Sequence, residues 1–476
     1  MQSNSRSASR RAPARASGLP SARQSAIDHL WMHNRGWAEM AEQGGPMVAV
    51  DGHGVRVKDG DGHWWLDANA GYVCVNVGYG RTEIADAAYE QMKRLAYFPG
   101  GSTTEPAAAL ARKLATLAPG DLSRTFFCSG GSEANEGAVK IARAFHKRVG
   151  EPGRYKIISR ESSFHGALGF SMWLGGMAGR PRTDYEPPPP GLIYAPQPNP
   201  YRFERYGRTP EEAAIRCAEA VEDLIRFHGP ETIAAFIAEP IAVPPGVAVP
   251  EAPYWPMIRS ICDRYGVLLI VDEVITGFGR TGKWFASEHW GVVPDIMSVA
   301  KGIVSAYLPL GATIARTEIA DAFSGVGKNK YLQHILTYGG HPVPAAAALK
   351  NIEIMENERL VDNSAKLGRY FLERLQELKD VHAIIGDVRG LGLLLGIELV
   401  QDATTKAPFS QDARIGERLT AEFEKRRIVL RPTSGTFWVG PALCITKDEI
   451  DELVNGLDGA IGQVAEQLGM AGRRRS

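Results

Sequence analysis

The sequence predicts an α/β fold, with a larger domain built on a mostly parallel sheet and a smaller α+β domain. Two runs of branched apolar residues, 233–238 and 267–271, each end abruptly in a carboxylate, Glu239 and Asp272. Such runs are typical of strands that are buried on both faces. Because strand and helix patterns alternate along the chain, parallel pairing is expected. Beyond about residue 346, amphipathic helical patterns alternate with strands, which indicates the separate smaller domain.

Length, charge and cysteine content narrow the class of protein. The 476 residues are enough for two or three domains and a large core. Lys plus Arg and Asp plus Glu are equal at 54 each, so the net charge gives no reason to expect nucleic acid binding. No apolar run is long enough to span a bilayer, and the five cysteines are never spaced as C-x-x-C. A cytoplasmic protein with reduced thiols and no zinc site is expected.

The N-terminal part predicts a tail and the first piece of the smaller domain. Residues 1–27 are rich in Ser, Ala and Arg and contain no acidic residue, so a disordered basic tail is expected, with an organelle transit peptide as the alternative. Residues 28–75 are assigned to the smaller domain. They open with a predicted helix at 28–32 and continue with two strands, 54–58 and 63–67, joined by an Asp-Gly turn.

Residues 76–345 are assigned to the larger domain and residues 346–476 to the smaller C-terminal domain. A glycine-rich loop at 69–80, which carries Tyr72, precedes a predicted helix from about Thr82. An aromatic residue on such a loop is more often a packing residue. A role for Tyr72 in the wall of a substrate site is the alternative.

Ser129-Gly130-Gly131-Ser132 is the second informative segment, because a short apolar strand leads into it and a helix follows it. The turn presents free backbone N–H groups and the positive end of a helix dipole, a geometry that holds a phosphate. A helix cap formed by Ser132 is the alternative. The place of the segment 129–132 among successive α/β units favours phosphate binding.

Phe164 follows the predicted strand 155–159 and either stacks on a flat ring or belongs to the core.

The stretch 187–200 is rich in Pro and is predicted to be a rigid surface connection without regular structure. Further helices are predicted at 210–227, 357–379 and 412–427, and a further strand at 392–400.

Asp272 and Lys301 are the residues around which the chain is organised. Asp272 ends one strand, and the next predicted strand, 294–299, delivers Lys301 to the same edge of the sheet. Open α/β sheets bind their ligands at this edge. An acid that keeps a pyridine nitrogen protonated and an amine that forms a Schiff base are what pyridoxal phosphate chemistry requires. The pair therefore predicts this cofactor.

The chain resembles the class III aminotransferases, pyridoxal phosphate enzymes of fold type I, in six motifs that occur in the order of that class: Ser-Gly-Gly-Ser-Glu-Ala, Phe-His-Gly, Ala-Glu-Pro-Ile, Val-Asp-Glu-Val-Ile-Thr-Gly-Phe-Gly-Arg-Thr-Gly, Ala-Lys-Gly and Thr-Tyr-Gly-Gly-His-Pro. The resemblance extends from about His29 to the last helix. It implies an aspartate aminotransferase-like fold with a mostly parallel seven-stranded sheet. Segments 75–81 and 431–432 are most similar to the ω-aminotransferases that use pyruvate as amino acceptor.

The resemblance implies a role for each matching residue. Lys301 would bond to the cofactor and then act as general base and acid, and Asp272 would pair with the pyridinium nitrogen. The other cofactor contacts would be the phosphate ligands Gly131 and Ser132, Thr337 reaching from the other subunit, the ring-packing residues Phe164 and Val274, and Glu239 near the phenolic side. Phe164 replaces the usual tyrosine, which keeps the stacking and loses a hydroxyl contact.

Arg431 is expected from the resemblance to bind the carboxylate of the keto acid and to swing aside for an uncharged amine. A guanidinium fork can bond both carboxylate oxygens. An arginine on the domain surface is the alternative.

The chain is accordingly predicted to be a transaminase that moves an amino group from a primary amine or ω-amino acid to pyruvate or a similar keto acid by a ping-pong mechanism. A homodimer or dimer of dimers with shared active sites is expected, without metal, nucleic acid or membrane partners.

Two alternatives stay open at the level of the sequence. Aminomutases, epimerases and decarboxylases use the same lysine and aspartate, so the motifs do not exclude them. A cofactor-binding regulator is a rival from another class of protein, and it requires a DNA-binding segment that the short N-terminal tail does not resemble.

Overall fold

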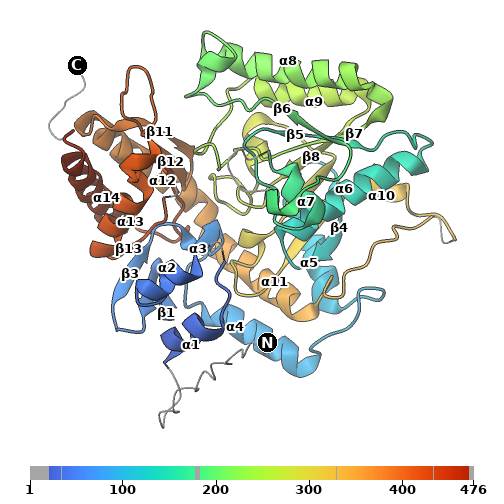
Figure 1. The fold of residues 1–476 in the computed structure, drawn as a ribbon. Helices are drawn as coiled ribbons and strands as arrows, with labels where there is room; N and C mark the ends of the chain where they lie inside the picture. The colour runs from blue at the N-terminus through green and yellow to red at the C-terminus, as the bar shows by residue number, and fades with distance from the viewer. Residues whose placement is uncertain (1–20, 34, 177–182, 328–329, 433, 471–476) are drawn as a thin grey trace, which may run out of the picture. The chain divides into compact units, whose positions relative to one another are not determined.

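The computed structural model describes residues 21–33, 35–176, 183–327, 330–432 and 434–470 (Figure 1). By its internal contacts the chain divides into two compact units. The first consists of residues 1–51 and 58–64, and the second of residues 52–57 and 65–476. The second unit holds nearly all of the regular structure and every residue that was predicted to bind a ligand.

The first unit contains two short helices, α1 (Ala22–His29) and α2 (Trp37–Glu42). The prediction of a helix at 28–32 is wrong in position, because α1 ends at His29. The helix begins after Ser21, whose side chain accepts a hydrogen bond from the backbone of Gln24, and this cap lies in the Ser-rich stretch that was assigned to the tail. Residues 1–20 of the predicted tail lie outside the described residues.

The two strands predicted near residues 54–67 are confirmed as β2 (Arg56–Asp59) and β3 (Trp64–Asp67). The turn between them is confirmed as well, since Gly62 N donates to Asp59 O over 3.1 Å. A short strand, β1 (Ala49–His53), precedes them.

A seven-stranded, mostly parallel sheet forms the centre of the second unit, which confirms the predicted fold class. From β9 to β6 the neighbouring strands are parallel, and β10 is antiparallel to both β9 and β4. In spatial order the strands are β4 (Leu122–Cys128), β10 (Gly311–Arg316), β9 (Ile296–Val299), β8 (Leu268–Asp272), β7 (Ile233–Ala238), β5 (Lys156–Arg160) and β6 (Leu192–Ala195).

Helices cover both faces of this sheet. Phe236 and Leu269 pack with α8 (Pro210–His228) and α9 (Tyr254–Tyr265), which lie side by side in Figure 1. Their neighbours in sequence, such as Ile237 and Ile270, pack with α6 (Gly131–Arg148) on the other face. Successive side chains of the central strands are therefore buried on opposite sides, which explains why these strands are continuous apolar runs.

The C-terminal part contains long helices and a second sheet. The predicted helices 357–379 and 412–427 are confirmed as α12 (Leu360–Val381) and α13 (Ile415–Lys425), and α14 (Lys447–Gln467) ends the described chain. The sheet is antiparallel, in the order β11 (Ile385–Leu391), β12 (Leu394–Leu399) and β14 (Thr436–Val439). A two-residue strand, β13 (Ile428–Val429), pairs in parallel with the end of β3.

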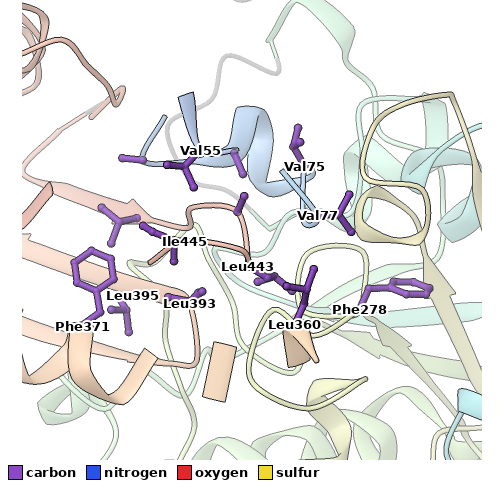
Figure 2. Packing of buried hydrophobic residues seen from close by; sticks show 14 of the residues in the cluster. Val55, Val75, Val77, Phe278, Leu360, Phe371, Leu393, Leu395, Leu443 and Ile445 are labelled. Carbon is purple, nitrogen blue, oxygen red and sulfur yellow. The ribbon is translucent and has the colours of Figure 1, made fainter. Parts of the chain in front are cut away.

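One buried apolar cluster connects this C-terminal part with the large sheet. Figure 2 shows a portion of it, from Phe371 and Leu395 at one end to Val77 and Phe278 at the other. The helix that leads into the C-terminal part, α11 (Pro342–Asn357), contributes to the same cluster. The segment around residue 77 is therefore held by side chains from distant parts of the sequence.

The prediction for the proline-rich stretch is wrong in one respect. Residues 192–195 form β6, which pairs in parallel with β5 at the edge of the large sheet. The strand has only four residues between two groups of prolines, so its apolar pattern was too short to detect.

Candidate active site

Asp272 and Lys301 lie at the same edge of the large sheet. Asp272 is the last residue of β8, and its Cα is paired with Ser298 of the neighbouring strand β9. Lys301 follows the end of β9 by two residues and adopts a left-handed conformation with φ 47°. Because the two strands are parallel, both side chains are delivered at their carboxyl ends.

Three hydrogen bonds fix the Asp272 carboxylate, which is 4% exposed. His165 Nδ1 lies 2.8 Å from Oδ2, and Asn135 Nδ2 donates to the same oxygen over 2.7 Å. Val274 N donates to Oδ1 over 3.0 Å. The carboxylate is thus held in one orientation, and Oδ1, which accepts a single bond, keeps a free lone pair.

Glu239 and Arg160 extend this buried group of charges. Arg160 Nη2 lies 3.2 Å from Glu239 Oε2, and Glu239 Oε1 accepts from Phe164 N over 2.9 Å. His165 Nε2 lies 3.7 Å from Glu239 Oε2. Burial by itself lowers the pKa of His165, but the charges of Glu239 and Asp272 outweigh burial and raise that pKa. The result is a line of alternating charges from Arg160 to Asp272.

The N-terminus of α6 adjoins this group. A Cβ atom on Gly131 would lie 2.8 Å from Cγ1 of Val274, so the helix start and the end of β8 approach as closely as glycine allows. Ser132 Oγ accepts from Ala167 N over 3.1 Å. Gly166 has φ 143°, and a Cβ atom there would lie 2.7 Å from Ser132 Oγ. Backbone N–H groups and the positive end of the helix dipole are presented beside Asp272.

The Lys301 side chain is half-buried. Burial lowers the pKa of its amine to about 8, and the nearby negative charge of Asp272 acts in the opposite direction. A larger fraction of the amine is therefore neutral near pH 7 than for an exposed lysine, and a neutral amine is the nucleophilic form.

Seven of the predicted site residues lie together in this region: Gly131, Ser132, Phe164, Glu239, Asp272, Val274 and Lys301. The other three, Thr337, Arg431 and Tyr72, are exposed. Thr337 is exposed, and its carbonyl accepts from Tyr97 Oη over 2.7 Å. Tyr72, in α3 (Ala70–Val73), is 70% exposed. Arg431 is exposed beyond β13, and within the described residues no hydrogen bond or ion pair engages its guanidinium.

Sequence reasoning did not identify Asn135, His165 or Arg160 as parts of the site. His165 stands inside the quoted motif Phe-His-Gly, and that position was the available signal. Asn135 lies one helical turn after Gly131 and faces Asp272 only once α6 packs on the sheet. Arg160 is the last residue of its strand, as Asp272 is, but a buried arginine cannot be recognised from its own sequence neighbourhood.

The comparisons with known proteins point to one family. A family model described as Aminotransferase class-III matches residues 39–461. The putrescine–pyruvate aminotransferase of Pseudomonas aeruginosa is 38% identical over 415 residues, which cover 86% of this chain and 89% of that protein. The taurine–pyruvate aminotransferase of Bilophila wadsworthia is 39% identical over 433 residues, which cover 89% of this chain and 94% of that protein.

Solved structures agree with the sequence comparison. A thermostable (S)-enantioselective omega-transaminase from Thermomicrobium roseum matches with a TM-score of 0.88 at 41% identity, covering 93% of this chain and 98% of that one. The omega transaminase of Pseudomonas jessenii matches with a TM-score of 0.90 at 33% identity, covering 95% of this chain and 100% of that one. Class III aminotransferases depend on pyridoxal phosphate as a family. The chain belongs to the class III aminotransferases and is a transaminase of fold type I.

Proposed function

We propose that this enzyme binds pyridoxal 5'-phosphate between α6 and the ends of β8 and β9, and transfers an amino group from a primary amine or ω-amino acid to pyruvate or a similar keto acid. The observation that carries the proposal is the placement of a fixed, buried carboxylate, a half-buried amine of lowered pKa and a helix N-terminus at one edge of the sheet. Ping-pong kinetics follow, because donor and acceptor use the same site in turn.

The residues present fit this cofactor. Gly131 and Ser132 would hold its phosphate at the start of α6, where backbone N–H groups are exposed for an anion. Phe164 and Val274 would pack on the two faces of its ring. Lys301 would hold its aldehyde carbon covalently. The buried Nε2 of His165, which has no hydrogen-bond partner within the described residues, shows that this polar region is not fully satisfied by the protein alone.

Asp272 and Glu239 would set the charge around the ring. Bound pyridoxal phosphate supplies an electron sink for negative charge that develops on the substrate carbon. Asp272 would keep a proton on the pyridine nitrogen, and opposite unit charges about 4 Å apart interact by roughly 4 kcal/mol at an effective dielectric near 20. Glu239, held by Arg160, would lie at the phenolic side without reacting. Lys301 would carry the proton to and from the substrate carbon.

Arg431 and Tyr72 are the residues that we propose for substrate recognition. The Arg431 guanidinium is exposed and unpaired among the described residues, so it is available to a carboxylate such as that of pyruvate. Two relatives, whose names specify pyruvate as acceptor, support the same choice of acceptor. Tyr72 would line the amine side of the site.

A homodimer or dimer of dimers is the proposed assembly, with Thr337 completing the phosphate site of the partner. An apolar patch supports it: Tyr89, Met92, Leu95 and Phe98 are exposed on and after α4 (Thr82–Arg94), and patches of this kind mark interfaces. Tyr97, within the same segment, binds the carbonyl of Thr337, so patch and threonine are contiguous.

We also propose a cytoplasmic location, which the five free cysteines support. No helix in the described part of the chain is long and apolar enough to cross a membrane.

A screen of amine donors against pyruvate tests the function. Purified holoenzyme is expected to form the keto or aldehyde product of the amine and alanine in equal amounts. Release of carbon dioxide and of the decarboxylated amine from an amino acid donor, without alanine, would indicate decarboxylation, and an isomerised donor without alanine would indicate aminomutase or epimerase chemistry; either result would contradict the proposal.

A further inference from the structure

The turn that begins at Lys301 has an unusual backbone. Lys301, Ser305 and Ala306 have φ values of 47°, 48° and 59°. Residues that carry a Cβ atom rarely adopt this left-handed region, and such conformations persist only where the surroundings impose them. The contacts around residues 301–306 therefore determine where the Lys301 amine is held.

Asn351 makes the principal contact from α11. The residue is fully buried, and its Nδ2 donates to Gly302 O over 2.9 Å and to Ile303 O over 3.1 Å. These are the two carbonyls directly after Lys301. The turn's own backbone bonds run from Ile303 N to Ala300 O at 3.1 Å and from Val304 N to Lys301 O at 3.3 Å, and they leave the Gly302 and Ile303 carbonyls to Asn351. One side-chain amide thus satisfies two buried acceptors in the turn.

Asn76 closes the opposite side of the turn. A Cβ atom on Gly302 would lie 2.4 Å from Asn76 Nδ2, so the amide packs directly against the residue after Lys301. Arg280 fixes this amide, because its Nη2 donates to Asn76 Oδ1 over 2.8 Å. At the far end of the turn, Val77 N donates to Ser305 Oγ over 3.2 Å. Asn351 is the member of this set that binds the turn's own backbone at Gly302 and Ile303.

We propose that Asn351 is a positioning residue for Lys301: by binding the carbonyls of Gly302 and Ile303, it holds the left-handed turn that keeps the Lys301 amine beside Asp272. Asn351 acts through the backbone and touches no reacting atom. The inference rests on the proposed role of Lys301 as the amine that bonds to pyridoxal phosphate.

The test compares Asn351→Ala with Asn363→Ala in the holoenzyme. Asn363, on α12, makes the same kind of double contact, donating to Leu443 O over 2.7 Å and to Ile445 O over 3.2 Å, and has no proposed role. Two quantities are measured: kcat and KM for an amine with pyruvate, and the pH midpoint at which the absorbance of the bound cofactor changes.

Asn351→Ala is expected to lower kcat about tenfold or more with KM within about twofold, and to move the absorbance midpoint by about half a pH unit or more. Asn363→Ala is expected to leave both quantities close to those of the unmodified enzyme. An unchanged midpoint in Asn351→Ala, or an equal shift in Asn363→Ala, would overturn the proposal.

Ser305→Ala decides the question if Asn351→Ala does not fold. Among the described residues, the hydrogen bond that this variant removes is the one from Val77 N at the other end of the turn. A shift of the absorbance midpoint relative to the unmodified enzyme supports the proposal, and no shift overturns it. Failure of the unmodified holoenzyme to carry the cofactor on Lys301 would instead overturn the proposed function, so the two failures are distinguishable.

Discussion

Replacement of Asp272 by Asn tests the proposed partner of the cofactor nitrogen. The variant keeps the shape of the side chain and removes its charge from a site that is 4% exposed. The interaction lost is roughly 4 kcal/mol for unit charges about 4 Å apart at an effective dielectric near 20. Because about 1.4 kcal/mol corresponds to a factor of ten in rate, kcat is expected to fall by roughly a thousandfold.

The same substitution also disturbs hydrogen bonding. Asp272 Oδ2 accepts from Asn135 and faces His165 Nδ1, while Oδ1 accepts from Val274 N. An amide has only one acceptor oxygen, so at least one of these buried donors loses its partner, at a cost in stability of about 1–3 kcal/mol. The thermal midpoint is therefore measured beside the kinetics.

Asp295→Asn is the matched control. This carboxylate is also buried, at 7% exposed, and it accepts from Leu269 N over 2.7 Å and from Arg259 Nη1 over 2.9 Å, away from the site. We expect a comparable loss of stability, with kcat within about threefold of the unmodified enzyme. Initial rates of alanine formation at saturating cofactor give the comparison. Near-normal kcat in Asp272→Asn, or an equal loss in Asp295→Asn, would refute the assignment.

Three further predictions concern the rest of the site. Lys301→Ala is expected to lose turnover and the absorbance of covalently bound cofactor, since no amine remains to hold it; a fully active variant would refute its role. Gly131→Ala places a Cβ atom 2.8 Å from Val274 Cγ1, so cofactor affinity in equilibrium dialysis is expected to fall about tenfold, whereas Gly169→Ala, with nothing within 4 Å, is the control that should not change. Arg431→Ala is expected to reduce kcat/KM for pyruvate roughly a hundredfold and that for an uncharged amine only a few-fold, and equal losses would remove its carboxylate role.

The central strands could be predicted from the sequence because the property that marks them, a run of apolar residues on both faces, is visible within a few consecutive residues. Residues 267–271 are apolar on both faces, and the change to Asp272 marks the carboxyl end of the strand. The edge strand β6 was not predicted, because four residues between prolines are too few to show the hydrophobic period of a strand. Helix α1 was misplaced because its cap, Ser21, is one serine among many in a low-complexity stretch.

The position of Asp272 and Lys301 at one edge of the sheet could be predicted, because each comes at the end of an apolar strand pattern. The network behind Asp272 could not, because the contact between Asn135 and His165 depends on how α6 and β5 pack against β8. The roles of Thr337 and Arg431 depend on a second subunit and on a substrate, which neither local pattern nor the geometry of one chain supplies. Both therefore stay predictions.

The most direct measurement is the chemical location of the cofactor. Borohydride reduction of the holoenzyme fixes pyridoxal phosphate to the amine that carries it, and peptide mapping by mass spectrometry then identifies that lysine. The account predicts a single modified residue, Lys301, and loss of the label when an amine donor is added before reduction. Label on a different lysine, or label on Lys301 that an amine donor does not remove, would contradict it.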